Sequence, residues 1–246
     1  MKILYAGDGP AGGSAIYLLG VLGALGADVR HVPPAERLTS RLAAQRYDAI
    51  LLSDFPHRRL PVASETAIVQ QVAQGTGLLM VGGWGSFAGP LGGWRGSKVA
   101  SLLPVTCLAR DDRVHFPGGA LVCRAQAHPM WRSLSFSTPP VICGLNAVRP
   151  RRHSRLLLTA RRIMAGTHPG QLRLDAVAHP LLIIDADPRK RIAALATDLA
   201  PHWCGGLVDW GTRRSALSVN GALRVEVGDR YVQFVASLVR WLAKAA

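Results

Sequence analysis

The stretch GLLMVGGWGSFAG, residues 77–89, decides the fold. Four apolar residues at 78–81 run directly into a pair of glycines. A short continuous apolar run bounded by glycine is typical of a strand buried on both faces, as in a parallel sheet. Glycine lets the chain turn sharply at the carboxyl end of such a strand, and open α/β sheets bind ligands at that end. The stretch therefore predicts a central strand and an elbow that borders a site.

The chain before the elbow alternates strands with helices. Apolar runs predict strands at residues 2–6, 28–32 and 47–53, and helix-forming segments separate them at 15–25, 35–46 and 64–73. We expect Ser14 and Ser64 to cap helices and Gly26 to end one. The order strand–helix–strand, repeated, indicates an α/β fold with a doubly wound parallel sheet and right-handed crossovers.

From Pro104 onward the pattern changes to short strands with tight connections. The runs PVTCLA, GALVCRA and PPVICGLNAV and residues 155–160, 172–178, 181–187 and 192–197 predict additional, antiparallel strands. The sequence DADP at 185–188 is typical of a turn between two such strands. A last helix is expected from Asp229, as its cap, to about residue 243. With no linker or repeat in view, we expect residues 1–246 to form one domain.

Composition indicates a cytoplasmic protein without a metal or a cofactor. Hydrophobic residues make up 49% of the 246, and no apolar run approaches the roughly 18 residues of a membrane span. The amino terminus, MKILYAGDGPAGG, lacks the apolar core of a signal peptide and fits a dinucleotide fingerprint only loosely. The four cysteines are widely spaced, and the histidines lack the helical i, i+4 spacing of metal ligands.

The net charge of +14 is concentrated in the middle of the chain. Residues 101–200 hold fourteen basic and six acidic residues, including the run RPRRHSR at 149–155. Such a patch attracts phosphates or nucleic acid, although a solvated loop and strand face is the plainer interpretation. No aromatic residue interleaves these arginines, so the stacking surface of a single-strand binder is missing. Nucleic-acid binding is therefore the weakest hypothesis.

Several motifs in order resemble the class I glutamine-amidotransferase-like superfamily, in particular its branch of uncharacterised amidotransferase-like cytoplasmic proteins. They are LLSDFP, the elbow stretch, LLPV, DDRV, HPMW, GLN and ATDLAPHW, and they span nearly the whole chain. The resemblance implies a flavodoxin-like, mostly parallel sheet. It also implies an elbow whose cysteine attacks the glutamine amide, with a later histidine followed by proline and glutamate.

This sequence departs from that catalytic pattern. The elbow reads GGWGS at 82–86, without a cysteine. His202 follows the apolar run IAALATD, where the resemblance places the catalytic histidine, but Trp203 and Cys204 come next. The chemistry needs a thiolate on the turn and an imidazole within hydrogen-bond reach. Glutamine hydrolysis by the family mechanism is therefore not expected.

Three residues are candidate catalytic groups, each with a plainer alternative. Ser86 is the only hydroxyl of the elbow and a possible nucleophile for His202, or else a serine that caps a turn. His202, expected at a strand end, is either functional or a hydrogen-bonded structural histidine. Asp54 follows the strand at 47–53, where it would orient His202 or a substrate, or simply form a turn.

A second group of residues is expected to shape a binding pocket. Trp84 and Trp203 would line it and suit a sugar or another flat ligand, the alternative being ordinary packing. Gly83 and Gly85 flank Trp84, and Asn146 resembles a loop residue at the same pocket. The neighbouring DDR at 111–113 is expected to form local salt bridges and not a metal site.

Three hypotheses follow. The first is a binding protein that has lost the thiol and holds a small polar ligand or a protein partner at the rim of the sheet. The second is a hydrolase of an amide, ester or sugar derivative that uses His202 with Ser86 or Asp54. The third is nucleic-acid binding through the basic mid-chain. Assembly as a symmetric homo-oligomer is expected only because it is common among such folds.

Overall fold

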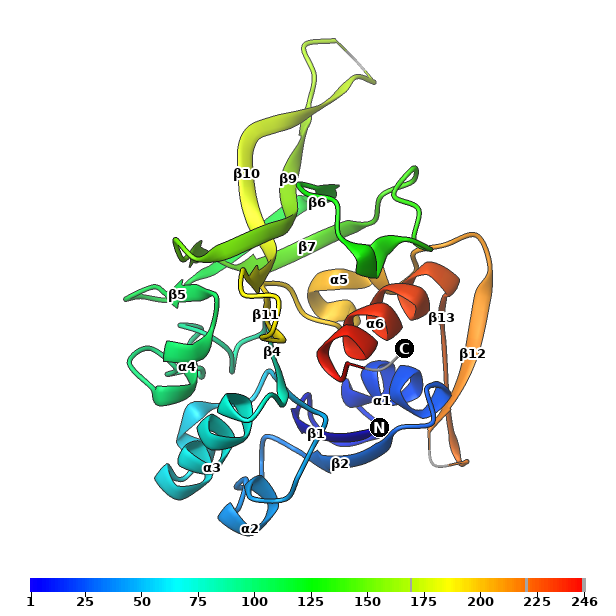
Figure 1. Ribbon diagram of the computed structural model, residues 1–246. Coiled ribbons are helices and arrows are strands. Elements are labelled where there is room, and N and C mark those ends of the chain that lie inside the picture. The colour runs from blue at the N-terminus through cyan, green and yellow to red at the C-terminus, as the bar shows by residue number, and fades with distance from the viewer. Residues whose placement is uncertain (169, 220, 245–246) are drawn as a thin grey trace.

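The central strand of the structure is the apolar run of the elbow stretch, and a nine-stranded sheet extends on both sides of it (Figure 1). The computed structural model describes residues 1–168, 170–219 and 221–244. In spatial order the strands are β2 (Asp28–Val32), β1 (Lys2–Gly7), β3 (Ala49–Ser53), β4 (Gly77–Val81), β11 (Ile192–Leu195), β10 (Leu172–Asp185), β9 (Ser154–Ala165), β6 (Arg113–Arg124) and β7 (Val141–Asn146).

The sheet changes character at β11. The five strands from β2 to β11 are parallel, in the order of a flavodoxin-like fold, and the pairs from β11 to β7 are antiparallel. β4 is buried along its whole length because it has a neighbouring strand on each side and helices above and below. The predicted α/β fold, mostly parallel with antiparallel strands in the second half, is confirmed.

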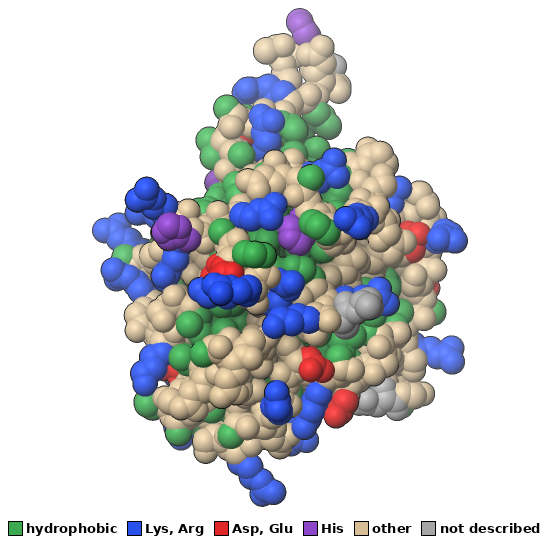
Figure 2. Space-filling view, in the orientation of Figure 1, with side chains coloured by type: hydrophobic (Ala, Val, Ile, Leu, Met, Phe, Trp, Pro, Cys, Tyr) green, Lys and Arg blue, Asp and Glu red, His purple; other side chains and the backbone are tan. Residues whose placement is uncertain are grey.

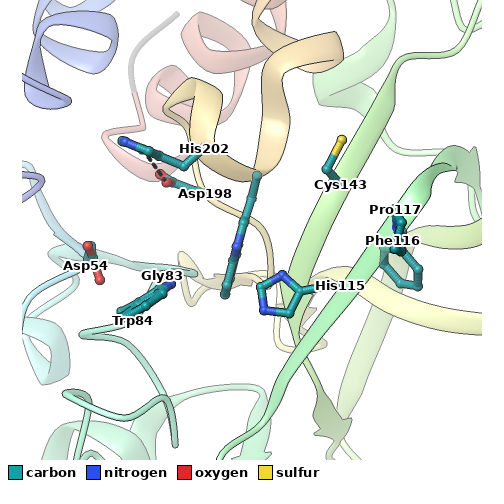
Figure 3. A pocket seen from close by; sticks show the side chains of 10 residues that line it. Asp54, Gly83, Trp84, His115, Phe116, Pro117, Cys143, Asp198 and His202 are labelled. Atoms are coloured by element: carbon teal, nitrogen blue, oxygen red, sulfur yellow. Dashed lines mark ion pairs between the residues drawn. The ribbon is translucent and has the colours of Figure 1, made fainter.

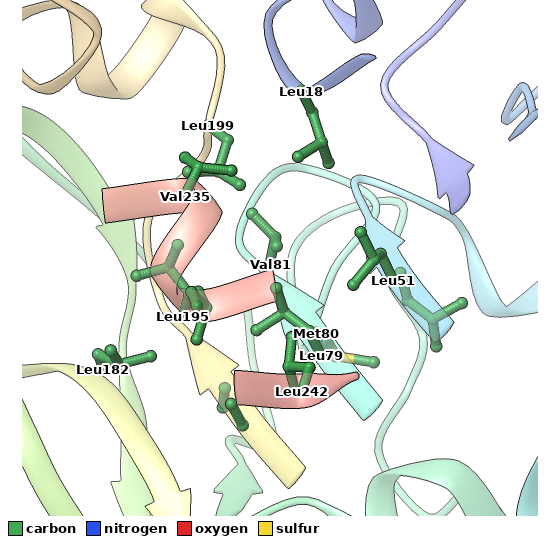
Figure 4. Close-up of a cluster of buried hydrophobic side chains, with 14 of the residues drawn as sticks. Leu18, Leu51, Leu79, Met80, Val81, Leu182, Leu195, Leu199, Val235 and Leu242 are labelled. Atoms are coloured by element: carbon green, nitrogen blue, oxygen red, sulfur yellow. The ribbon is translucent and has the colours of Figure 1, made fainter. Parts of the chain in front are cut away.

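Helices cover both faces of the parallel half (Figure 1). The helices α1 (Ala15–Ala24) and α6 (Asp229–Leu242) lie on one face, and α3 (Val62–Ala73) lies on the other beside α2 (Ser40–Ala43) and α4 (Lys98–Leu102). Val235 and Leu242 of α6 pack with Leu79 and Leu195 of the sheet in the core shown in Figure 4. Backbone approach there is close, since a Cβ on Gly77 would lie 2.4 Å from the carbonyl oxygen of Leu242.

Smaller elements complete the fold. Two short strands pair with each other, β5 (Val105–Cys107) and β8 (Val148–Pro150), and the hairpin of β12 (Arg214–Val219) and β13 (Leu223–Gly228) packs on α1. The remaining elements are α5 (Pro201–Val208) and the 3-10 turns η1 (His57–Arg59) and η2 (Pro129–Trp131). Within the described residues no helix is long and apolar enough to cross a bilayer.

Several expected helix ends are wrong. The helix expected at 35–46 is only the four residues of α2, capped by Thr39. Ser14 makes no side-chain cap bond, and Ser64 lies inside α3, where its hydroxyl donates to the carbonyl oxygen of Leu38. Asp229 begins α6, but its carboxylate accepts from the backbone N–H groups of residues 212 and 213. Long-range contacts thus replace the expected local caps at Ser64 and Asp229.

The antiparallel half contains a projecting arm that was not expected. Two strands were predicted at 172–178 and 181–187, but residues 172–185 form the single strand β10, which is irregular between Leu174 and Ala178 and around Pro180. Together with β9 it extends well beyond the body of the sheet (Figure 1). The predicted turn at 185–188 does join the antiparallel strands β10 and β11.

Candidate functional site

The elbow after β4 depends on glycine at consecutive positions. Gly83 has φ +147°, a backbone conformation that glycine adopts readily and other residues avoid. A Cβ on Gly82 would lie 2.3 Å from the carbonyl oxygen of Ala196, and one on Gly83 would lie 2.6 Å from Oδ1 of Asp54. The chain can therefore turn here only without side chains, and this brings the carboxyl ends of β3, β4 and β11 close together.

Asn146, at the end of β7, holds the elbow in place. It is fully buried, and its side chain accepts from the N–H of Gly83 at 2.9 Å and donates to the carbonyl oxygen of Gly83 at 3.2 Å. The same amide donates to Oδ1 of Asp112 at 2.7 Å, and Oδ2 of Asp112 accepts from the N–H of Ala88 at 2.8 Å. Asn146 is thus a strand residue behind the pocket, where the sequence suggested a loop residue beside it.

Ser86 is also part of the scaffold. Its side chain is 1% exposed, donates to the carbonyl oxygen of Val81 at 2.5 Å and accepts from the N–H of Asp54 at 3.1 Å. A hydroxyl that is buried and donates its hydrogen to a backbone carbonyl has neither the access nor the contact with a base that a nucleophile needs. The geometry argues for its plainer interpretation, a serine that fixes a turn.

A pocket of about 570 Å³ opens at the carboxyl ends of the parallel strands (Figure 3). We call it the elbow pocket. Its volume falls in the range of small-molecule sites, and its position is the one that open α/β sheets use for ligands. Ten residues line it: Asp54, Gly83, Trp84, His115, Phe116, Pro117, Cys143, Asp198, His202 and Trp203.

His202 and Asp198 form an ion pair at one side of this pocket. His202 lies in the first turn of α5, not at a strand end, and its Nδ1 is 3.8 Å from Oδ2 of Asp198. Asp198 is held by the N–H groups of Leu199 and Ala200, both bonded to its Oδ1. The interaction with Asp198 raises the pKa of the His202 imidazole above its usual value, against an opposing effect of partial burial. The His202 side chain is 70% exposed, so its imidazole is accessible to solvent.

Two further carboxyl groups lie at the same rim. Asp54 and Asp8 end β3 and β1 in the left-handed region, with φ +50° and +57°. Burial raises the pKa of Asp54, and the N–H of Gly85, which bonds its Oδ1, opposes that shift. Burial and the nearby Asp198 raise the pKa of Asp8, which also accepts a 2.6 Å bond from the hydroxyl of Tyr5. The carboxyl groups of Asp8, Asp54 and Asp198 therefore place several hydrogen-bond acceptors at this rim.

Aromatic side chains form another part of the lining. Trp84 is 51% exposed, and the Arg113 guanidinium lies over its ring, 4.4 Å from the centroid. Trp203 is buried and meets the edge of His115, with the ring centroids 5.8 Å apart. Gly144 lets Trp203 approach β7, because a Cβ there would lie 2.8 Å from the indole ring. Both tryptophans line the elbow pocket.

The structure brings together some of the predicted site residues and separates others. Asp54, Gly83, Trp84, His202 and Trp203 line the elbow pocket, whereas three others lie behind it: Ser86, Gly85 and Asn146. No hydrogen bond joins His202 to Asp54 or Ser86 within the part of the chain that is described. The N–H of Gly85 is engaged by Asp54 and so serves to fix that carboxylate.

Sequence reasoning missed the part that five lining residues take in the pocket. Asp198 ends the run IAALATD, and its i, i+4 spacing to His202 across a helix start was a usable signal. His115, Phe116 and Pro117 come from β6, and Cys143 comes from β7; nothing local marked them. The exposed Cys143 thiol lies away from the His202–Asp198 pair in Figure 3.

The described side chains do not form a metal centre, since no group of three or more His, Cys, Asp or Glu residues among them is arranged to hold an ion. The predicted salt bridge after residue 110 is present between Arg113 and Asp111 at 2.6 Å. Asp112 does not join it, because its carboxylate bonds Asn146 and Ala88.

Sheet order, elbow and rim pocket together define the class I glutamine-amidotransferase-like fold. A family model described as "Putative glutamine amidotransferase" (GATase1_like) matches residues 14–220, and the chain belongs to this family. No curated protein is similar enough to the chain to match it.

Three solved structures illustrate the likeness. The cytoplasmic protein STM3548 from Salmonella typhimurium is 24% identical with a TM-score of 0.64, and 82% of this chain and 90% of that one are covered. STM1381 from Salmonella typhimurium LT2 is 26% identical, with the same TM-score and coverage. A Thermoplasma acidophilum protein described as a putative GMP synthase component is 11% identical with a TM-score of 0.50, covering 98% and 95% of the two chains, which shows a shared fold.

Proposed function

We propose that this protein binds a small polar ligand in the elbow pocket and does not hydrolyse glutamine through a cysteine. The observation that carries the proposal is the composition of the pocket. It combines an aromatic wall with Asp54, Asp198 and His202, and residues 82–86 of the elbow contain no thiol. The only cysteine among the described lining residues, Cys143, lies on β7 and not at the elbow.

The lining selects the chemistry of the ligand. Carboxylates accept hydrogen bonds, and no lysine or arginine is among the described lining residues, so hydroxyl or amine groups are favoured over phosphates or carboxylates. Tryptophan faces pack against flat, partly apolar rings. A sugar or a sugar-like polyol satisfies both requirements, and we place its hydroxyl groups toward Asp54 and Asp198 and its ring toward Trp84 or Trp203.

The proposal also covers the cellular location, the number of domains and the oligomeric state of the protein. Two similar structures are named cytoplasmic proteins, which supports a cytoplasmic location, and we treat residues 1–246 as one domain. We also propose two alternatives to test. The pocket binds a protein partner in place of a small ligand, and the protein assembles as a homo-oligomer. Light scattering of the pure protein and of Leu172→Asp tests self-association through the β9–β10 arm, where Leu172 is 75% exposed.

A hydrolase is the second candidate, favoured by the His202–Asp198 pair. Asp198 engages Nδ1 and leaves Nε2 for a substrate, and the raised pKa keeps more of the imidazole protonated near neutrality. In an amide, ester or sugar derivative, Asp54 would take a proton from water while the oxygen of that water bonds to the substrate carbon. The bond to the leaving group then breaks, and His202 supplies the proton that the leaving group needs.

A ligand screen by thermal shift tests the first proposal. Sugars, polyols, amines, amides and glutamine are compared on wild type, Trp84→Ala and His202→Ala, with His153→Ala as a histidine control outside the elbow pocket. A ligand at a hundredfold excess over its dissociation constant adds roughly 2.7 kcal/mol to stability. We expect a sugar or polyol to raise the melting temperature of wild type and His153→Ala only. Stabilisation that survives in both pocket variants would move the site elsewhere.

The same ligands distinguish binding from hydrolysis. Any compound that stabilises the protein is incubated with it, and its products are followed by mass spectrometry. Product formation that is lost in His202→Ala and Asp198→Asn would establish the hydrolase. Unchanged ligand after prolonged incubation with stoichiometric amounts of protein would leave binding as the function of the pocket.

A further inference from the structure

A second pocket, of about 590 Å³, lies at the amino ends of the parallel strands, whereas the elbow pocket lies at their carboxyl ends. We call it the amino-edge pocket because it borders the start of β11 at Ile192 and the turn at Gly75 that leads into β4. Its apolar surface comes from the end of α3 and from the segment after α4, including Val72, Leu103 and Pro104. The rest of its lining comes from residues 151–153 and from the β10–β11 turn.

The amino-edge pocket is strongly basic. Its lining contains Arg151, Arg152, His153, Arg189, Lys190 and Arg191 against Asp185 and Asp187. Both carboxylates are already paired, Asp187 with Arg189 at 3.0 Å and Asp185 with Lys190 at 3.6 Å. Lysine and arginine side chains gather around the β10–β11 turn in Figure 2. Three guanidinium groups are therefore left without a carboxylate among the described residues.

Two of these three guanidinium groups are held in position by the protein. Nε of Arg151 donates to the carbonyl oxygen of Val105 at 3.1 Å, and its Nη2 donates to that of Ala100 at 3.2 Å. The Arg191 guanidinium lies over the ring of Trp241, 5.3 Å from the centroid. Arg152 is exposed and free of such contacts in the described structure. Restrained guanidinium groups lose less freedom on binding an anion than mobile ones do.

We propose that the amino-edge pocket binds a small organic molecule that carries phosphate. Arginine forks match phosphate oxygens, and Arg152 and Arg191 can approach them from the two sides supplied by residues 151–153 and the β10–β11 turn. The organic part meets the apolar side chains of Ala73 and Leu102, which line the pocket and are not fully buried. The volume is that of a small-molecule site. This site is independent of the elbow pocket, whose described lining has carboxylates and no lysine or arginine.

The lining argues for a small molecule over a nucleic acid. A nucleic-acid surface combines a basic track with aromatic rings that stack on bases. His153 is the only residue with an aromatic ring among the described lining residues, and the basic groups surround one pocket, not a long track. Part of the positive charge in the middle of the sequence is thus gathered at one pocket. The strands β8 and β9 and the β10–β11 turn bring residues 151–153 and 189–191 together there.

Isothermal titration at about 0.15 M salt tests the proposal with pyrophosphate, ATP and, as an uncharged control, adenosine. The variants are Arg152→Ala and the double variant Arg152→Ala with Arg191→Gln. Arg224→Ala is the matched control, since Arg224 is exposed on β13 and outside the pocket. A lost hydrogen bond to a charged group corresponds to about tenfold in affinity or more. We therefore expect ATP to bind wild type and Arg224→Ala alike and the double variant at least tenfold more weakly.

Three results would overturn the proposal. ATP and pyrophosphate fail to bind wild type at this salt concentration, or they bind the double variant as tightly as wild type. Alternatively, a single-stranded oligonucleotide binds more tightly than ATP, with ATP unable to displace it, which would assign the surface to nucleic acid. Circular dichroism of the double variant checks that it is folded. The single variant Arg152→Ala changes an exposed residue, and it must bind ATP more weakly than wild type but more tightly than the double variant.

Discussion

Replacing Asn146 by alanine tests whether a buried amide holds the elbow in place. The change removes three hydrogen bonds, at 2.9 and 3.2 Å to Gly83 and at 2.7 Å to Asp112. A neutral bond contributes about 1 kcal/mol net, and one to a charged group contributes about 1.5–3 kcal/mol. Because the site is fully buried, the partners left behind find little solvent. We expect the free energy of unfolding to fall by roughly 3–5 kcal/mol.

Urea denaturation of wild type and Asn146→Ala measures this loss, which corresponds to roughly 6–20 °C in melting temperature for a chain of this size. Asn146→Asp supplies a second test, since it places a carboxylate against that of Asp112. Adding Asp112→Asn restores an amide–carboxylate pair with the roles exchanged, and part of the stability should return. A loss below about 1 kcal/mol in Asn146→Ala, or no recovery in the exchanged pair, would refute the reasoning.

Three further predictions concern the rim. In an NMR titration the His202 imidazole should have a midpoint above 6.5, and Asp198→Asn should lower it; a wild-type midpoint at or below 6.5 contradicts the pairing. Asp8→Asn should raise the free energy of unfolding near pH 7, because burial raises the folded pKa of the carboxyl group and disfavours its charged form in the native state. That gain should vanish below about pH 4 in urea denaturation, where the unfolded carboxyl is protonated too. Gly144→Ala should push Trp203 out of place and weaken any elbow-pocket ligand, because the added Cβ would lie 2.8 Å from the indole ring; wild-type affinity would show that Trp203 is not part of the binding wall.

The parallel half of the fold was predictable because its signals are local. Each buried strand is a short apolar run that ends at a glycine or a polar turn, and β1, β3 and β4 lie at the positions of those runs. The helix α5 and the hairpin β12–β13 were not predicted. A helix of eight residues with two glycines has little propensity of its own, and it forms on the support of Trp203 packed over Gly144.

The sequence by itself determined the class of fold, the position of the elbow and the lack of a thiol there, and it singled out His202, Asp54 and Trp84 as candidate site residues. Each of these depends on residue type and on near neighbours along the chain. Only the tertiary structure decided that Asp198 is the partner of His202 and that Ser86 is buried scaffold. It also brought Arg152 and Arg191 to one pocket. Strand register and crossovers set such distances between residues far apart in sequence, and no local pattern encodes them.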